Sequence, residues 1–194
     1  RTRSFDDMIY FLGETLRNVA HVPIRNRGTV AGNLGAASPA GDSHPILLAT
    51  DAVVEVESTR GSREIAIGDF FTGVKRNALA DDELIAAVRV PRPTGPQQYS
   101  KIGTRNAMVI AVAAFAVALH PDQRRVGTGM GSVAPTPRRA TEAEAFLAGA
   151  LAEGRRNDRV QRSVGHEDGN RGVRRVGFGR EGPAEGQVAR EGDD

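Results

Sequence analysis

Ile24-Arg-Asn-Arg-Gly-Thr-Val-Ala-Gly-Asn-Leu34 is the stretch of this 194-residue chain from which its fold can be argued. Residues 25–35 hold too many glycines and asparagines for a regular element, so we expect a loop over them. Such a loop presents backbone N–H groups with little side-chain obstruction, and Thr29 and Asn33 add a hydroxyl and an amide as directed donors. These groups suit the oxygens of a pyrophosphate. A Gly-rich turn that merely connects a helix to a sheet accounts for the same residues equally well.

Helix signals lie on both sides of this stretch and again near residue 140. Three helices are expected, over 5–18, 42–49 and 140–151. Apolar residues three and four positions apart predict the first. Asp42 is expected to cap the second, in which a proline occupies the first turn. Thr141, with Glu144 three residues on, is expected to open the third as a capping box.

Alternating apolar and polar residues, bounded by Gly and Pro, predict strands elsewhere. These strands are expected over 52–58, 63–67, 83–90, 98–104 and 125–133. The stretch 107–119 stays open between helix and strand, because its alanines favour one and its valine spacing the other. Phe70 and Phe71 are expected to plug a core from a compact turn. Strands joined by short turns, with helices at the ends, predict an α+β fold rather than a parallel βαβ sheet.

The composition excludes several classes of site. The chain has no Cys, so it holds no disulfide, thiolate zinc site or iron–sulfur cluster of its own. Its 26 basic and 24 acidic residues are too evenly balanced to indicate a nucleic-acid or membrane-surface protein. The four histidines, at no metal-ligand spacing, are expected to be solvated or structural. We expect no metal site, no catalytic residue and a cytoplasmic location.

Common catalytic and nucleotide-binding motifs find little support in the chain. There is no HExxH, GxSxG or P-loop sequence. Residues 127–132 approach the dinucleotide-binding pattern GxGxxG, but Ser132 replaces its last glycine and no βαβ unit follows. We expect this segment to be the end of a glycine-containing strand.

The character of the sequence changes after residue 153. Residues 154–194 contain no Leu, Ile, Met, Lys or Thr, and Arg, Gly and acidic residues dominate. Such a segment cannot bury enough apolar surface to offset its chain entropy. It is expected to be disordered, or to be the product of a shifted reading frame. An Arg/Gly arm for nucleic acid is disfavoured because acidic residues balance the arginines and no aromatic rhythm accompanies them.

Five segments, in order, resemble one known family. They are Ile24–Leu34, Ala37-Ser-Pro-Ala-Gly-Asp42, Asp69-Phe-Phe-Thr-Gly73, Asp81-Asp-Glu-Leu-Ile85 with Val90-Pro-Arg-Pro93, and Tyr99-Ser-Lys-Ile-Gly-Thr-Arg-Asn-Ala-Met108. Together they resemble the FAD-binding (medium) subunit of molybdenum hydroxylases, the family of the carbon monoxide dehydrogenase medium subunit and of the flavin portion of xanthine dehydrogenase and aldehyde oxidase. The resemblance covers about residues 5–151.

The resemblance implies a fold and a division into domains. It implies the second subdomain of a PCMH-type FAD-binding fold, a mostly antiparallel sheet with flanking helices, without the family's first subdomain. The implied divisions are a partial FAD-binding domain over 1–120, the beginning of the C-terminal α+β domain over 121–153, and the tail 154–194. Two residues depart from the family pattern: Ala31 stands where Gly is usual, and Val109 where Asp is usual.

Eight cofactor-binding residues follow from the resemblance by position. Five of them would wrap the FAD pyrophosphate, namely Thr29, Val30, Ala31, Gly32 and Asn33. Asp42 would hold a polar group of the cofactor, and Ile85 would pack on the isoalloxazine. Lys101 would lie near the polar edge of the flavin, where a cation stabilises its anionic reduced form.

The resemblance also implies an electron-transfer role. Electrons would enter at a molybdopterin centre in a large partner subunit, cross two [2Fe–2S] clusters in a small partner subunit, and reach FAD here. NAD, oxygen or another molecule would accept them, and carbon monoxide, a purine, an aldehyde or an aromatic heterocycle could be the substrate. The chain alone is expected to bind FAD weakly or not at all and to be inactive. The rival hypotheses are an assembly module without flavin and a flavoenzyme that oxidises its substrate directly.

Overall fold

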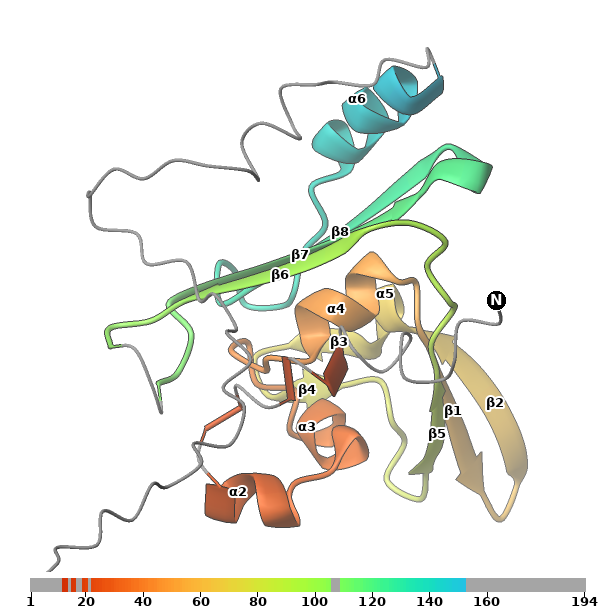
Figure 1. The fold of residues 1–194 in the computed structure, drawn as a ribbon. Helices are drawn as coiled ribbons and strands as arrows, with labels where there is room; N and C mark the ends of the chain where they lie inside the picture. The colour runs from red at the N-terminus through yellow and green to blue at the C-terminus, as the bar shows by residue number, and fades with distance from the viewer. Residues whose placement is uncertain (1–11, 14, 17–18, 21, 106–108, 153–194) are drawn as a thin grey trace, which may run out of the picture. The chain divides into compact units, whose positions relative to one another are not determined.

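The computed structural model describes residues 12–13, 15–16, 19–20, 22–105 and 109–152 (Figure 1). Most of the expected helix over 5–18 lies outside these residues, although positions 12, 13, 15 and 16 are helical. The expected tail over 154–194 also lies outside them, so both of its interpretations stay predictions.

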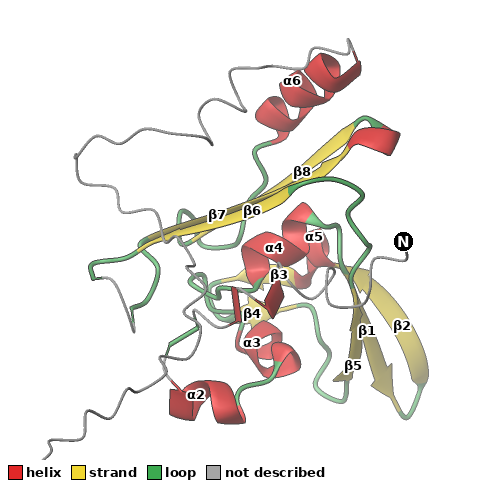
Figure 2. Cartoon of the chain, viewed as in Figure 1, coloured by secondary structure: helices red, strands yellow, loops and turns green. Residues whose placement is uncertain are grey.

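The helices of the described residues are short, apart from the last (Figure 2). They are α2 (Val22–Arg27), α3 (Val30–Ala36), α4 (His44–Ala49), α5 (Ile67–Phe70) and α6 (Thr141–Ala152), with a 3₁₀ turn η1 at Pro121–Gln123. The expectation of a loop over 25–35 was wrong, because α2 and α3 occupy most of this segment. Thr29 caps α3, and Ala37, in the left-handed conformation, ends it. These end contacts outweigh the weak helix propensity of the glycines and the asparagine between them.

The strands form three antiparallel sheets, which confirms the α+β class. The first has the order β2 (Gly61–Ala66), β1 (Val53–Ser58), β5 (Leu84–Arg89), and the second pairs β3 (Phe71–Gly73) with β4 (Arg76–Asn77). The third has the order β6 (Gln97–Ile102), β7 (Ala113–His120), β8 (Arg125–Gly131). The stretch left open between helix and strand is therefore a strand from residue 113, and residues 127–131 are strand, as expected.

The predicted domain boundary between residues 120 and 121 lies in the turn between β7 and β8, which pair along their whole length. The third sheet as a unit begins at residue 97. The division into domains stays a prediction. No helix in the described part of the chain has the length and apolar character needed to cross a membrane.

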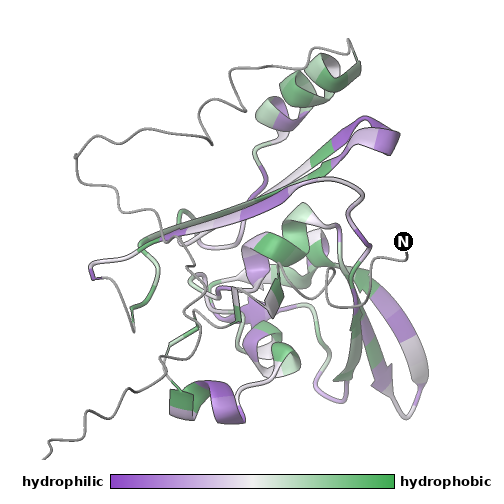
Figure 3. Cartoon of the chain, viewed as in Figure 1, coloured by the Kyte–Doolittle hydropathy of each residue, from purple (hydrophilic) through white to green (hydrophobic). Residues whose placement is uncertain are grey.

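α4 is the centre of the packing, and all six of its residues are buried. Leu47 and Leu48 join the larger core cluster, which includes residues of β1, α3 and α5 and both Phe70 and Phe71. Ile46 and Ala49 join a second cluster with alanines of β7. Much of α4 and of β5 is accordingly hydrophobic, whereas the edge strand β2 is mainly hydrophilic (Figure 3). The two phenylalanines plug the core as predicted.

Two glycines let β8 approach the backbone of α4. A Cβ added at Gly127 would overlap the carbonyl oxygen of Ala49, and one added at Gly129 would overlap that of Pro45. Only glycine fits such a close approach of two backbones. The glycine pattern that approaches a dinucleotide motif is therefore explained by helix–sheet packing. This packing fixes the segment that precedes α4, where the candidate site lies.

A polar network joins the start of α6 to β8. Glu144 accepts hydrogen bonds from the Thr128 amide at 2.7 Å, the Thr128 hydroxyl at 2.5 Å and Arg139 Nε at 2.9 Å. Arg139 also pairs with Asp51. Burial raises the pKa of Glu144, but its hydrogen bonds to Arg139 and Thr128 lower it further, so the net shift is downward. The predicted capping box with Thr141 was wrong, since these partners engage the Glu144 carboxylate instead.

Replacing Glu144 with Ala is expected to lower the free energy of unfolding by about 2 kcal/mol, because the Thr128 amide loses its acceptor and Arg139 loses one of its two carboxylate partners. Urea unfolding of the full chain measures the change. Glu142→Ala is the matched control, because Glu142 is exposed in the same helical turn. Equal stabilities of the two variants would show that the network contributes nothing.

Candidate functional site

Residues 29–33 form the first turn of α3 rather than an open loop. The Thr29 hydroxyl accepts a hydrogen bond from the Gly32 amide at 2.9 Å, and the Thr29 carbonyl accepts one from the Asn33 amide at 3.0 Å. Two of the N–H groups expected to face a pyrophosphate are therefore engaged within the turn. The amides of Val30 and Ala31 lie too early in the helix for an intrahelical partner. Ala31 has no positive φ, so its methyl group fits where the family has glycine.

A cavity of about 200 Å³ lies beside the end of this turn, and we call it the polar cavity because Asn33, Ser38 and Asp42 interrupt a lining that is otherwise mostly apolar. Its walls include Asn33 from α3, Gly41 and Asp42 from the segment between α3 and α4, and Val109 from the chain before β7. The Asn33 Nδ2 group donates no hydrogen bond to another described residue. Val109, at the position where the family carries Asp, gives this cavity an apolar wall.

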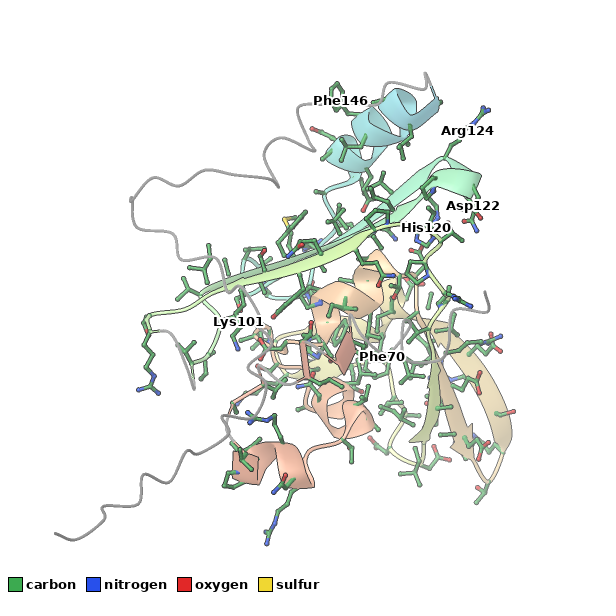
Figure 4. The ribbon with its side chains drawn as sticks, viewed as in Figure 1. Phe70, Lys101, His120, Asp122, Arg124 and Phe146 are labelled. Atoms are coloured by element: carbon green, nitrogen blue, oxygen red, sulfur yellow. The ribbon has the colours of Figure 1, made fainter. Side chains whose placement is uncertain are left out.

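Asp42 and Lys101 form an ion pair across the elements that build the site. Lys101 Nζ lies 2.8 Å from Asp42 Oδ2, and the two side chains are only 11% and 7% exposed. Lys101 projects from β6 on the side of the sheet where α4 lies (Figure 4). Tyr99, two residues before it on the same face, donates its hydroxyl proton to Asp42 Oδ1 at 3.3 Å. Burial, with the Asp42 charge, raises the pKa of Tyr99, so its hydroxyl stays protonated.

Two buried residues after Asp42 hold Asn33. Ser43 Oγ donates to Asn33 Oδ1 at 2.5 Å, and His44 Nε2 lies 3.3 Å from the Asn33 carbonyl oxygen. The His44 ring packs 4.4 Å from the Phe71 ring, centroid to centroid. Burial lowers the pKa of His44 from 6.5 to about 4, against the opposing effect of the Asn33 and Ser38 carbonyls. His44 is therefore neutral near pH 7 and can donate from Nε2 to Asn33.

The folded chain is expected to lose stability as the pH falls from about 6.5 to about 4 through His44. In this window the unfolded chain binds a proton at His44 that the folded chain does not, so acid favours unfolding. A shift of this size corresponds to a loss of roughly 3 kcal/mol. Urea unfolding between pH 7 and pH 4 should show a smaller loss in His44→Gln than in the parent chain. Parallel curves would contradict the buried neutral state of His44.

A second cavity, of about 240 Å³, is apolar. Val30 and Ala31 of α3 line it together with Ile85 of β5 and neighbouring residues of that strand. Ile85 also packs against the larger core cluster and pairs with Val56 across the first sheet. Ile85 therefore contributes to the core and also lines a cavity that a ligand can enter.

Six of the eight predicted residues fall into two groups around α3. Asn33 and Asp42 line the polar cavity and Lys101 pairs with Asp42, whereas Val30, Ala31 and Ile85 line the apolar cavity. The remaining two, Thr29 and Gly32, form the turn that begins α3. Sequence reasoning thus chose residues that the fold brings together on two sides of one short helix.

Sequence reasoning missed three residues of this site: Ser43, His44 and Tyr99. The spacing of Tyr99 and Lys101 places both on one face of a strand, and this signal could have found Tyr99. His44 was expected to be solvated or structural, and it is completely buried. Nothing in the local sequence around Ser43 predicts its contact with Asn33, ten residues away.

Comparison with known sequences and structures gives the context of this geometry. Residues 2–93 match the family described as "FAD binding domain in molybdopterin dehydrogenase". The chain belongs to this family. The predicted resemblance to the FAD-binding medium subunit of molybdenum hydroxylases is thereby confirmed, and FAD is the cofactor of the family's domain.

Relatives of this FAD-binding family support the assignment over a longer stretch. The chain is 35% identical over 136 residues to the nicotinate dehydrogenase FAD-subunit of Eubacterium barkeri, covering 66% of this chain and 46% of the relative. It is 33% identical over 145 residues to the carbon monoxide dehydrogenase medium chain of Afipia carboxidovorans, covering 72% and 50%. The chain thus spans about half the length of these curated relatives. Both are subunits of oxidoreductases by name.

A solved structure shares the fold. Carbon monoxide dehydrogenase from Oligotropha carboxidovorans, in its reconstituted form, matches with a TM-score of 0.68 and 29% identity, covering 77% of this chain and 58% of that one. The predicted fold class, an α+β fragment of the FAD-binding fold, is confirmed by this likeness together with the antiparallel sheets.

The chemistry of the two cavities fits FAD. The cofactor combines an apolar ring system with a hydroxylated chain and an anionic pyrophosphate. The apolar cavity suits the ring system. The polar cavity offers polar groups the Asn33 Nδ2 group, which has no partner among the described residues, and the Asp42 carboxylate, which pairs with Lys101. Both cavities lie against α3, so one extended ligand can contact both.

Proposed function

We propose that this chain holds FAD in a cytoplasmic molybdenum hydroxylase and relays electrons from a partner's [2Fe–2S] clusters to an acceptor such as NAD. A large partner subunit would supply the molybdopterin centre and the substrate site, and a small one the clusters. Bound FAD supplies the capacity to take up electrons and pass them on. The absence of Cys from the chain supports this division, because the clusters need thiolate ligands from elsewhere.

The observation that carries the proposal is that Asn33 and Asp42 line one cavity and that Asp42 forms a buried ion pair with Lys101. These residues come from α3, the following turn and β6, and Lys101 is 59 positions from Asp42 in the sequence. A Gly-rich turn that only connected a helix to a sheet would not need a buried ion pair beside it. Burial of charged groups is expensive, so the pair needs a compensating role.

The chain's residues would divide the work of binding. The Thr29 hydroxyl, which accepts from Gly32, still has its own proton to donate to a pyrophosphate oxygen. The backbone amides of Val30 and Ala31, which lie too early in α3 for an intrahelical partner, would face the pyrophosphate, and Ile85 would exclude water from the ring system. Asp42, whose carboxylate has lone pairs beyond those that Lys101 and Tyr99 use, would accept from a cofactor hydroxyl.

Lys101 would place its positive charge near the reduced cofactor while Asp42 balances it in the oxidised state. The two opposite charges balance each other, so neither residue leaves a strong uncompensated charge at the site. Electron uptake adds negative charge to the cofactor. A nearby cation lowers the free energy of that negatively charged reduced form.

The test follows the visible absorption of bound flavin in the chain purified with its partner subunits. Substrate should bleach the flavin band when the molybdenum subunit is present, and removal of that subunit should stop the bleaching. Bleaching that persists without molybdenum would favour direct oxidation at the flavin. Absence of flavin from the complete assembly would favour the assembly module, and either result would contradict the relay.

A further inference from the structure

Two consecutive side chains contact both ends of one residue. Ser43 Oγ binds the Asn33 side chain at 2.5 Å, and His44 Nε2 faces the Asn33 carbonyl oxygen at 3.3 Å. Ser43 and His44 are both completely buried. Asn33 is therefore held at its amide group and at its backbone by the residues that begin α4.

The Ser43 contact fixes which end of the Asn33 amide faces the cavity. A side-chain amide can present either its oxygen or its NH₂ group. Because the Ser43 hydroxyl donates to Oδ1, the oxygen is engaged and the Nδ2 group is left as a donor. Asn33 lines the polar cavity, where a donor attracts an anionic oxygen and an exposed acceptor would repel it.

The His44 ring is locked in place by close packing on two sides. A Cβ at Gly41 would overlap the His44 ring, so the absence of a side chain at Gly41 makes room for it. The ring of Phe71 lies on another side, 4.4 Å away. A ring confined in this way can hold the Asn33 carbonyl in one position.

The cost of this arrangement indicates that it serves more than packing. His44 Nδ1 is buried and has no hydrogen-bond partner among the described residues. An unpartnered buried nitrogen lowers stability, and an apolar side chain of similar size would avoid that cost. The polar contacts that histidine gains in exchange are to the carbonyl of Asn33, 3.3 Å from Nε2, and to the carbonyl of Ser38.

We propose that Ser43 and His44 are positioning residues that orient Asn33, so that its Nδ2 group donates to the pyrophosphate of FAD. The inference rests on the proposed function, because it names two residues behind the same binding site. Neither residue needs to touch the cofactor.

Binding of FAD and of riboflavin to the deflavinated assembly tests this role, with each flavin followed by fluorescence quenching. Ser43→Ala should weaken FAD binding by about tenfold or more, the effect of losing one hydrogen bond to a charged group. Riboflavin has no phosphate, so its affinity should stay the same. Ser43→Thr should restore FAD binding, and Ser62→Ala, at an exposed position of β2, is the matched control.

A double-mutant cycle supplies the second measurement. If Ser43 acts through Asn33, then Asn33→Ala with Ser43→Ala should bind FAD no more weakly than Asn33→Ala alone. His44→Gln should show the same dependence on Asn33. Additive effects, equal losses for FAD and riboflavin, or unchanged FAD binding in Ser43→Ala would overturn the positioning role. Failure of the parent assembly to bind FAD would instead overturn the proposed function.

Discussion

Lys101→Met should lower the free energy of unfolding by about 3 kcal/mol and greatly weaken FAD binding. The variant keeps most of the apolar stem but leaves the Asp42 carboxylate buried without its cation. Removing one partner of a buried pair costs far more than the pair contributes, because the remaining charge is uncompensated. Urea unfolding of the full chain and FAD titration of the deflavinated assembly measure the two effects.

The double variant Asp42→Asn, Lys101→Met separates stability from binding. It removes both charges, so most of the lost stability should return. FAD binding should stay weak, because the groups proposed to contact the cofactor are still absent. Recovery of both properties would show that the ion pair serves the fold alone. Lys75→Met, outside the two cavities, controls for loss of a lysine charge.

Gly129→Ala should destabilise the chain by about 3 kcal/mol or more. The new methyl group would overlap the carbonyl oxygen of Pro45, which is backbone and cannot rotate away. α4 would have to move from β8, and with it the Asp42, Ser43 and His44 segment that precedes and begins α4. Thermal unfolding measures the loss of stability, and FAD affinity in the assembly should fall as well.

Gly149→Ala is the control for this glycine. Gly149 lies exposed in α6, and a Cβ there would meet nothing within 4 Å. Replacing glycine by alanine in such a helix should raise stability by about 0.5–1 kcal/mol. A similar loss in both variants would contradict the close approach of α4 and β8.

The sequence predicts the strands well because their signals are local. Alternation over 53–58 and 84–89, and the prolines after β5, mark elements that the structure contains. The prediction of a loop over residues 25–35 was wrong, because propensity indicates a loop there, whereas the side-chain cap at Thr29 and the left-handed Ala37 stabilise the ends of helix α3. Residues 113–120 form a strand rather than a helix because they pair with β6 and β8, and no local pattern in the sequence encodes that pairing.

The site was predicted from a family resemblance rather than from physics alone. The resemblance selected residues that gather at two cavities, including Asp42 and Lys101. It did not reveal that these two pair with each other, since their contact depends on how β6 lies against the turn before α4. The resemblance also did not identify Ser43 and His44 as site residues, because their partner Asn33 lies on a separate helix.

The flavin content of the purified assembly tests the central claim most directly. Flavin is released by denaturation and counted against this chain, with molybdenum and iron measured in the same sample. The account predicts about one FAD per chain in the parent assembly, and a large loss of FAD in Lys101→Met without loss of molybdenum or iron. A parent assembly without FAD, or full retention of FAD in Lys101→Met, would contradict it.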